Sequence, residues 1–135
     1  MKKVLIPIII TALALVSIQS CDISEKLFQE VIKQANEQCP NDMGDGMVMT
    51  GIAYDGQNVV YSISCDAENY YLEQELVTPE VKQASIDELL TKEASDKNVK
   101  TFLTFVRKVK AGIVYHYYVS DTDQTMDVYL EPGEF

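Results

Sequence analysis

Residues 47–65 read MVMTGIAYDGQNVVYSISC, two largely apolar runs separated by Asp55 and Gly56. An Asp-Gly pair between two such runs is typical of a tight β-hairpin turn, because both residues tolerate the backbone angles that the turn needs. In the second run, residues 59, 61, 63 and 65 are apolar or aromatic and two of the residues between them are serines, so one strand face suits a core and the other is wetter. This stretch therefore predicts a hairpin with strands at Met47–Tyr54 and Asn58–Cys65.

A second pair of strands is predicted at Ile113–Ser120 and Thr125–Leu130, around a turn rich in aspartate. Helices are predicted before and between the two hairpins. Apolar residues recur at helical spacing from Ile23 to Ala35, and this helix should end before Pro40.

Thr78 and Pro79 predict the start of a second helix, since Thr caps a helix and Pro fits its first turn. The residues between the first hairpin and Thr78 are expected to include another extended segment. After a break at Ser95–Asn98, a third helix is predicted to stop at Gly112. The order helix, hairpin, helix pair, hairpin predicts an α+β fold in which helices pack on one face of an antiparallel sheet.

The first residues carry the features of a secretory signal. Two lysines precede an apolar stretch, Val4–Val16, that is too short to span a bilayer as a stable helix. The IQSC run at Ile18–Cys21 resembles the lipobox of bacterial lipoproteins, in which the cysteine is acylated and becomes the first mature residue. The alternative is ordinary cleavage close to Cys21, which would leave a free thiol. We expect residues 1–21 to be a lipoprotein signal peptide and residues 22–135 to form one domain.

Charge and composition narrow the functional classes. The 135 residues include 21 acidic and 11 basic side chains, for a net charge of −10, and 47% are apolar. Removal of residues 1–21 takes away two lysines and no acid, so 21 acids and 9 bases remain, a net charge of −12. The apolar fraction excludes a disordered acidic tail, and the negative charge argues against nucleic acid as a partner. An acyl group on Cys21 would hold this acidic domain on the periplasmic or outer face of a bacterial envelope.

The cysteines left after such processing are Cys39 and Cys65. An exported protein meets an oxidising compartment, and the first hairpin would bring Cys65 to within a few residues of Cys39, so a disulfide between them is expected. The alternative is two buried free thiols. Two cysteines and one distant histidine do not make a zinc site, so no metal is expected.

Two polar clusters have simple structural explanations. An EF-hand loop that began at Asn41 would need oxygen ligands where Met43 and Ile52 stand, so a solvated loop is expected at residues 41–46, NDMGDG. Arg107, Lys108 and Lys110 lie in the last turns of the third helix, where cations offset the negative end of the helix dipole. An anion site is the less favoured interpretation of these three residues.

Candidate functional residues lie in the second hairpin. Alternation places His116 and Tyr118 on the outer side of their strand, and Asp127 and Tyr129 on the outer side of the next. A His and Asp pair beside tyrosines is suited to acid–base chemistry, but no nucleophile motif and no phosphate-binding glycine loop accompanies it. We therefore expect a non-catalytic protein without a cofactor. Tyrosine is favoured at protein interfaces, so these four residues are the predicted interaction face.

Three stretches carry a resemblance to known proteins: QCP at Gln38–Pro40, YDGQNVVYSIS at Tyr54–Ser64, and KAGIVYHYYVSDTDQTMDVYLEPGEF at Lys110–Phe135. They resemble small lipoproteins of anaerobic Gram-negative bacteria to which no catalytic residue is assigned. The arrangement of a helix followed by strands is also similar to PepSY-like and beta-lactamase-inhibitor-like domains of the envelope. That fold-level similarity implies binding or inhibition.

The sequence thus predicts a membrane-anchored envelope lipoprotein that acts as a binding or structural module, with an envelope protein as its partner. The competing prediction is a small-ligand-binding protein or an enzyme that uses the open sheet face. Convergence of the four side chains in a concave pocket would favour a ligand, and a flat face would favour a protein partner.

Overall fold

The computed structural model describes residues 3–4 and 25–135. Most of the expected signal peptide, including Cys21, therefore lies outside the described residues. The described elements follow one another in this order: β1 (Lys3–Val4), α1 (Glu25–Asn36), β2 (Asn41–Gly44), β3 (Met47–Tyr54), β4 (Asn58–Cys65), β5 (Tyr70–Tyr71), the 3-10 helix η1 (Gln74–Leu76), α2 (Pro79–Ser95), α3 (Lys97–Lys108), β6 (Gly112–Val119) and β7 (Thr125–Leu130).

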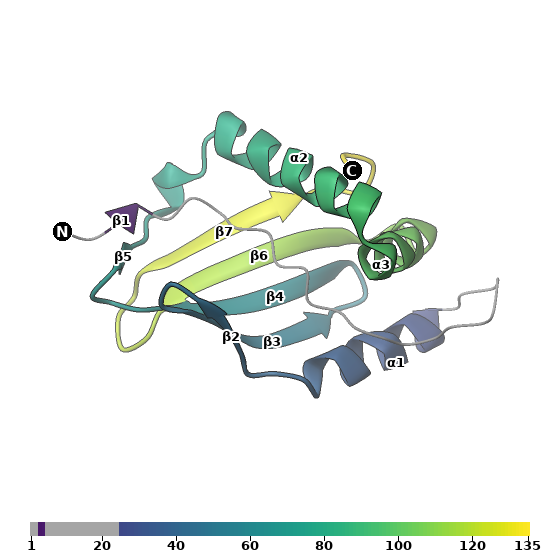
Figure 1. Ribbon diagram of the computed structural model, residues 1–135, viewed down its shortest axis with the longest axis horizontal. Helices are drawn as coiled ribbons and strands as arrows, with labels where there is room; N and C mark the ends of the chain where they lie inside the picture. Colours follow the sequence, from purple (N-terminus) through teal and green to yellow (C-terminus); the bar gives the residue numbers. More distant parts are fainter. Residues whose placement is uncertain (1–2, 5–24) are drawn as a thin grey trace.

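Five strands form the main sheet in the order β2-β3-β4-β6-β7 (Figure 1). The neighbours run antiparallel except β4 and β6, which are parallel with Asn58 beside Gly112 and Cys65 beside Val119. The expectation of a wholly antiparallel sheet was therefore wrong at its centre. The α2–α3 crossover carries the chain back to the end of the sheet where β4 began, and a long helical connection of this kind is what parallel neighbours require. β1 and β5 form a separate two-residue parallel pair.

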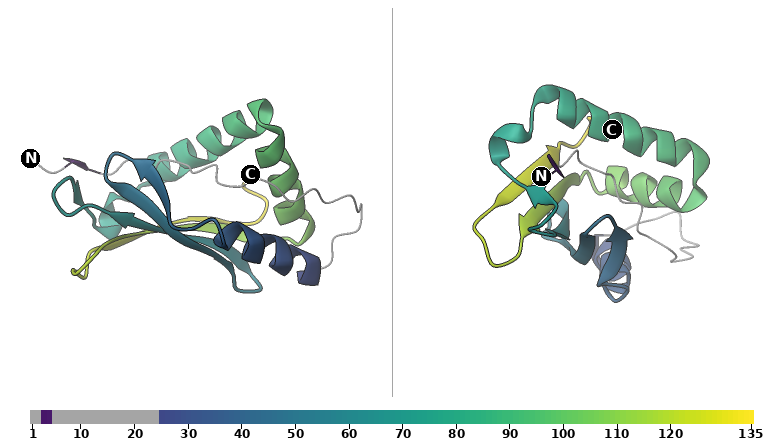
Figure 2. Two further views of the ribbon diagram at one scale, coloured as in Figure 1. Left: turned by 60° about the horizontal axis from the view of Figure 1, so that its bottom comes forward. Right: turned by 60° about the vertical axis from the view of Figure 1, so that its left-hand side comes forward.

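All three helices cover one face of this sheet, which confirms the predicted α+β architecture (Figure 2). Phe28 of α1 stacks with Phe102 of α3 at 6.3 Å between ring centroids, so the two helices belong to one layer. Strand residues of alternating position point into this layer and are almost fully buried. They include Met47, Met49, Ile52, Val59, Tyr61, Ile63, Cys65, Ile113, Tyr115, Tyr117, Val119, Met126, Val128 and Leu130.

The first hairpin has the predicted bounds, and its turn is closed by Asp55. The Asp55 carboxylate accepts the backbone N–H groups of Gln57 and Asn58 at 2.8 and 2.7 Å, and these hydrogen bonds lower the pKa of Asp55. Gly56 has a φ of +95°, which glycine adopts without a steric penalty. The turn was predictable because it uses the side-chain acceptor of an aspartate and the positive φ of a glycine.

A β-bulge in β3 was not predicted. The register shifts between Met49 and Gly51, so Thr50 is an extra residue on the outer face. The side chain of Asn36, the last residue of α1, accepts the backbone N–H of Ile52 at 3.0 Å. The bulge is therefore fixed by the end of the first helix.

Helix α2 begins as predicted at Pro79, with Thr78 Oγ1 accepting the backbone N–H of Val81 at 3.2 Å. The expected stop of the third helix at Gly112 was wrong. Helix α3 ends at Lys108, and Lys110 takes the left-handed conformation with a φ of +57°. Gly112 is the first residue of β6, where a Cβ would lie 2.5 Å from the side chain of Asn58.

Residues 41–46 are also more ordered than the expected loop, because Asn41–Gly44 forms β2 and pairs with β3. This short strand explains why the expected disulfide is not formed and why Cys39 and Cys65 are free cysteines. Since β2 and β4 flank β3 on opposite sides, two strand spacings, about 9–10 Å, separate the strand after Cys39 from the strand that ends at Cys65. A disulfide needs Cα atoms within about 7 Å.

Candidate functional site

The open face of the sheet brings His116 and Asp127 together. They are direct neighbours on β6 and β7, and His116 Nδ1 lies 2.5 Å from Asp127 Oδ1. A carboxylate oxygen accepts, so Nδ1 donates and the imidazole is turned toward β7. The side chains are 35% and 50% exposed, so an approaching molecule can reach both. The sequence-based expectation that this pair shares the outer face is confirmed.

Tyr118 extends the pair across the sheet. Its ring stacks on that of His116, with centroids 5.7 Å apart and planes 23° from parallel. Its hydroxyl lies 3.0 Å from Thr50 Oγ1, and Thr50 also donates to the backbone carbonyl of Ser62 at 3.2 Å. Because Thr50 belongs to β3 and Tyr118 to β6, the tyrosine reaches across β4. The stacked pair of rings is thus held by Asp127 on the His116 side and by Thr50 on the Tyr118 side.

Sequence reasoning missed Thr50, because it is the extra residue of the bulge. The signal that points to it is Gly51, since a glycine inside a strand pattern often marks a bulge.

Tyr129 lies in a neighbouring row of the same face. It pairs in register with Val114 and is 39% exposed, while its ring covers Gly112. No hydrogen bond or ring contact among the described residues joins Tyr129 to His116, Tyr118 or Asp127. The four predicted residues therefore share a surface, and three of them form a connected cluster.

Gln74 of η1 closes the edge of the sheet beside this cluster. Its side-chain amide accepts the backbone N–H of Asp127 and donates to the Asp127 carbonyl, both at 2.9 Å. These are the groups that an added strand would use, so β7 is protected against edge pairing here. A molecule that binds near Asp127 therefore meets the open face rather than this part of the strand edge.

Ser62, His116 and Asp127 stand side by side on β4, β6 and β7. In the described part of the chain, no hydrogen bond joins Ser62 to His116, so the row lacks the contact by which a histidine activates a nucleophile. A search of the same residues finds no group of three or more metal-ligating side chains. His116 and Asp127 place hydrogen-bonding groups on this face, and the stacked rings of His116 and Tyr118 add aromatic surface to it.

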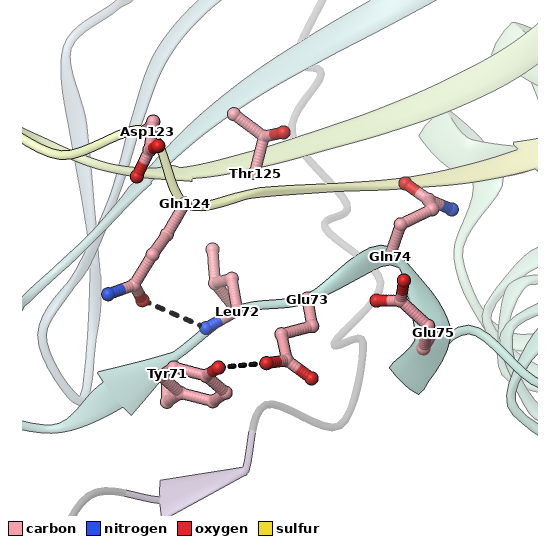
Figure 3. Close-up of a pocket in the computed structure, with 8 residues that line it drawn as sticks. All are labelled: Tyr71, Leu72, Glu73, Gln74, Glu75, Asp123, Gln124 and Thr125. Carbon is pink, nitrogen blue, oxygen red and sulfur yellow. Dashed lines mark hydrogen bonds between the residues drawn. The ribbon is translucent and has the colours of Figure 1, made fainter.

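The pockets formed by the described residues include two that lie away from the predicted face. One, of about 410 Å³, lies between the β5–η1 segment and the start of β7 and is lined by Glu73, Glu75 and Asp123 among others (Figure 3). The other, of about 440 Å³, is lined by Arg107, Lys110 and Phe135 among others. None of His116, Tyr118, Asp127 and Tyr129 lines either pocket.

The basic cluster at the end of α3 is partly neutralised. Arg107 binds both carboxylate oxygens of Glu93, at 2.5 and 2.9 Å, and donates to the carbonyl of Phe135. The Arg107 hydrogen bonds lower the pKa of Glu93, and Glu93 in turn raises that of Arg107. This ion pair supports the structural explanation of the cluster over an anion site.

Each helix in the described residues is too short or too polar to cross a membrane. No protein-family model matches the chain, and no curated protein matches it significantly. Among solved structures, it is similar to a crystal structure of a "putative secreted protein" from Pseudomonas aeruginosa, with 14% sequence identity and a TM-score of 0.48. The match covers 76% of this chain and 85% of that one. The function is therefore inferred from the residues of this chain.

Proposed function

We propose that this chain is an exported lipoprotein, anchored through Cys21, whose open sheet face binds a second protein of the cell envelope. The observation that carries the proposal is the connected cluster of Thr50, Tyr118, His116 and Asp127 on the sheet face opposite the three described helices. Side chains that are already held in place lose little conformational freedom on binding, which favours association.

Charge on this face supports a protein partner. Strands β3, β4, β6 and β7 carry one aspartate, Asp127, and one histidine, His116. Both side chains point outward, and they bind each other. The expected mature domain carries −12, so the open face is unusually poor in unpaired charge. Interface centres are depleted in charge and enriched in tyrosine. An exposed arrangement that lines neither of the two pockets described above suits a protein surface better than a small ligand, which needs a concave pocket.

The size of the face sets the expected strength of binding. A face four strands wide, at about 4.8 Å between strands, and about seven residues long, at about 3.3 Å per residue, has an area of about 440 Å². A stable interface buries about 800 Å² on each partner. We therefore expect a transient complex, or one that extends onto the flanking loops, and a covalent trap is the suitable way to detect it.

The test replaces Tyr129 with the photoreactive residue p-benzoylphenylalanine and crosslinks the protein in the cell envelope. Leu90 on α2 is the control position, because it is apolar and 38% exposed but does not belong to the sheet. We expect a crosslinked product of discrete mass from position 129 and none from position 90. The same products from both positions would overturn the proposed face.

Lipidation is tested separately. The N-terminal peptide of the purified protein should begin at an acylated Cys21, and Cys21→Ala should release the chain from the membrane fraction. An unmodified Cys21 in membrane-extracted protein would overturn the anchor and leave the proposed face to be judged by crosslinking.

A further inference from the structure

The two ends of the sheet differ in what they carry. At one end the start of α1 meets the β3–β4 turn, because Tyr54 donates its hydroxyl to Glu25 at 3.1 Å. The α3–β6 connection joins them there, since the Gly112 N–H binds the carbonyl of Gln57 at 3.0 Å. We call this the tether end, because α1, whose first residue is Glu25, begins here (Figure 1).

The opposite end is strongly acidic. The β2–β3 hairpin, the loop after β4 and the β6–β7 turn meet there, with the Asp66 N–H binding the Gly46 carbonyl at 2.9 Å. Residues 41–46, 66–69 and 120–124 contain no Lys or Arg. We call this the acidic end, and its six carboxylates belong to Asp42, Asp45, Asp66, Glu68, Asp121 and Asp123.

Charges at the tether end are nearly balanced. Lys26, Arg107, Lys108 and Lys110 lie at this end, and so do Glu25, Asp55, Glu131 and Glu134, because Leu130 pairs with Ile113. An anionic membrane surface therefore repels the acidic end far more strongly than the tether end. This difference acts over about a Debye length, close to 8 Å at physiological salt.

The length of the tether limits how the anchored domain can stand. Glu25 is four residues after Cys21, so it lies at most about 14 Å from the acylated residue. The sheet is eight residues long at β4 and β6, which is about 26 Å. The acidic end therefore lies at least about 12 Å from the acylated residue in any orientation, and up to about 40 Å from it when the sheet stands upright.

We propose that the anchored domain rests with its tether end against the phospholipid headgroups and its acidic end pointing away from the membrane. This orientation rests on the proposed lipidation of Cys21. In this orientation the strands run along the membrane normal, so the open face with His116 and Tyr118 is perpendicular to the membrane plane. A partner protein held at the same membrane surface can then bind this face from the side.

The test measures the height of two fluorescent labels above a vesicle. Full-length lipidated protein carries one new cysteine, Gln57→Cys at the tether end or Ala67→Cys at the acidic end, with Cys39 and Cys65 both replaced by alanine. Both label positions are exposed, and Ala67→Cys keeps every carboxylate of the acidic end. The vesicles contain phosphatidylcholine and phosphatidylglycerol, with a nitroxide quencher on the headgroups.

We expect the label at position 57 to be quenched at least about twofold more than that at position 67, given a height difference near 26 Å. The control variant Glu68→Gln/Asp121→Asn/Asp123→Asn removes three acidic charges, so this difference should shrink. Equal quenching of the two labels on lipidated, vesicle-bound protein would overturn the orientation alone. A chain that does not float with the vesicles would overturn the proposed anchor and the orientation together.

Discussion

Asn36 Oδ1 accepts the backbone N–H of Ile52 at 3.0 Å, and so the last residue of α1 completes the bulge of β3. Ile52 is 4% exposed, so water cannot replace this acceptor easily. Asn36→Ala should lower the free energy of unfolding by about 1–3 kcal/mol, the cost of an unsatisfied buried donor. Asn36→Asp keeps an acceptor and should retain more stability. Denaturant unfolding of both variants gives the comparison, and equal losses would contradict the role of this hydrogen bond.

Among the described glycines, Gly112 leaves the least room for a side chain. A Cβ there would lie 2.5 Å from Asn58 Oδ1 and 2.9 Å from the Leu130 carbonyl. Gly112→Ala should destabilise the protein by about 1–3 kcal/mol, the usual cost of overpacking. Gly51→Ala is the matched control, because its nearest neighbour would be 3.3 Å away. Thermal unfolding should show the larger loss at position 112.

The ion pair between Glu93 and Arg107 should make stability depend on pH. Arg107 lowers the pKa of Glu93 in the folded state, so the pair stabilises the protein above the ordinary pKa of 4.5. This contribution is lost as the pH falls through the lowered folded pKa. Glu93→Gln should cost about 1 kcal/mol at neutral pH and less in acid. Unfolding measured across this pH range checks the sign, and a constant difference would contradict it.

Thiol labelling should distinguish the two cysteines of the domain. Burial raises the pKa of the Cys65 thiol to about 11, so at pH 8 only about one molecule in a thousand carries the reactive thiolate. Cys39 is half-buried and should react with iodoacetamide first. Both should react in denaturant without a reductant. Labelling of neither cysteine under those conditions would contradict the free thiols of the structure.

The cluster around His116 should control crosslinking more than stability. With the photoreactive residue at position 129, Asp127→Ala or His116→Ala should reduce the crosslinked product several-fold, because the first change frees the His116 ring and the second removes it. Both side chains are more than a third exposed, so the free energy of unfolding should change by less than about 1 kcal/mol. Lys100→Ala on α3 is the control and should leave the product unchanged. A large loss of stability would indicate a structural role instead.

Much of the fold could be predicted from side-chain periodicity, since alternation and the Asp55–Gly56 turn gave the bounds of β3 and β4 and the outer position of His116. The features that could not be predicted depend on long-range contacts. β2 exists because β3 offers it a free edge, and Thr50 reaches the site through a bulge that Asn36 stabilises from outside the strand.

The same limit explains the disulfide and the edge of the sheet. The prediction considered the first hairpin alone, which would bring Cys65 close to Cys39. Strand β2 was not predicted, and it places Cys39 on the far side of β3 from Cys65. Gln74 lies in a segment without clear periodicity, and its partner Asp127 is 53 residues away. No local pattern contains such a contact.

The parallel pairing of β4 with β6 has a consequence for the order in which the protein is made. The centre of the sheet joins residues 58–65 to residues 112–119, which the ribosome synthesises much later. Until then β4 has one open edge and the helices have no complete surface to cover. Contacts between such distant segments also form slowly. A chain with this topology therefore completes the centre of its sheet only after residues 112–119 have been synthesised.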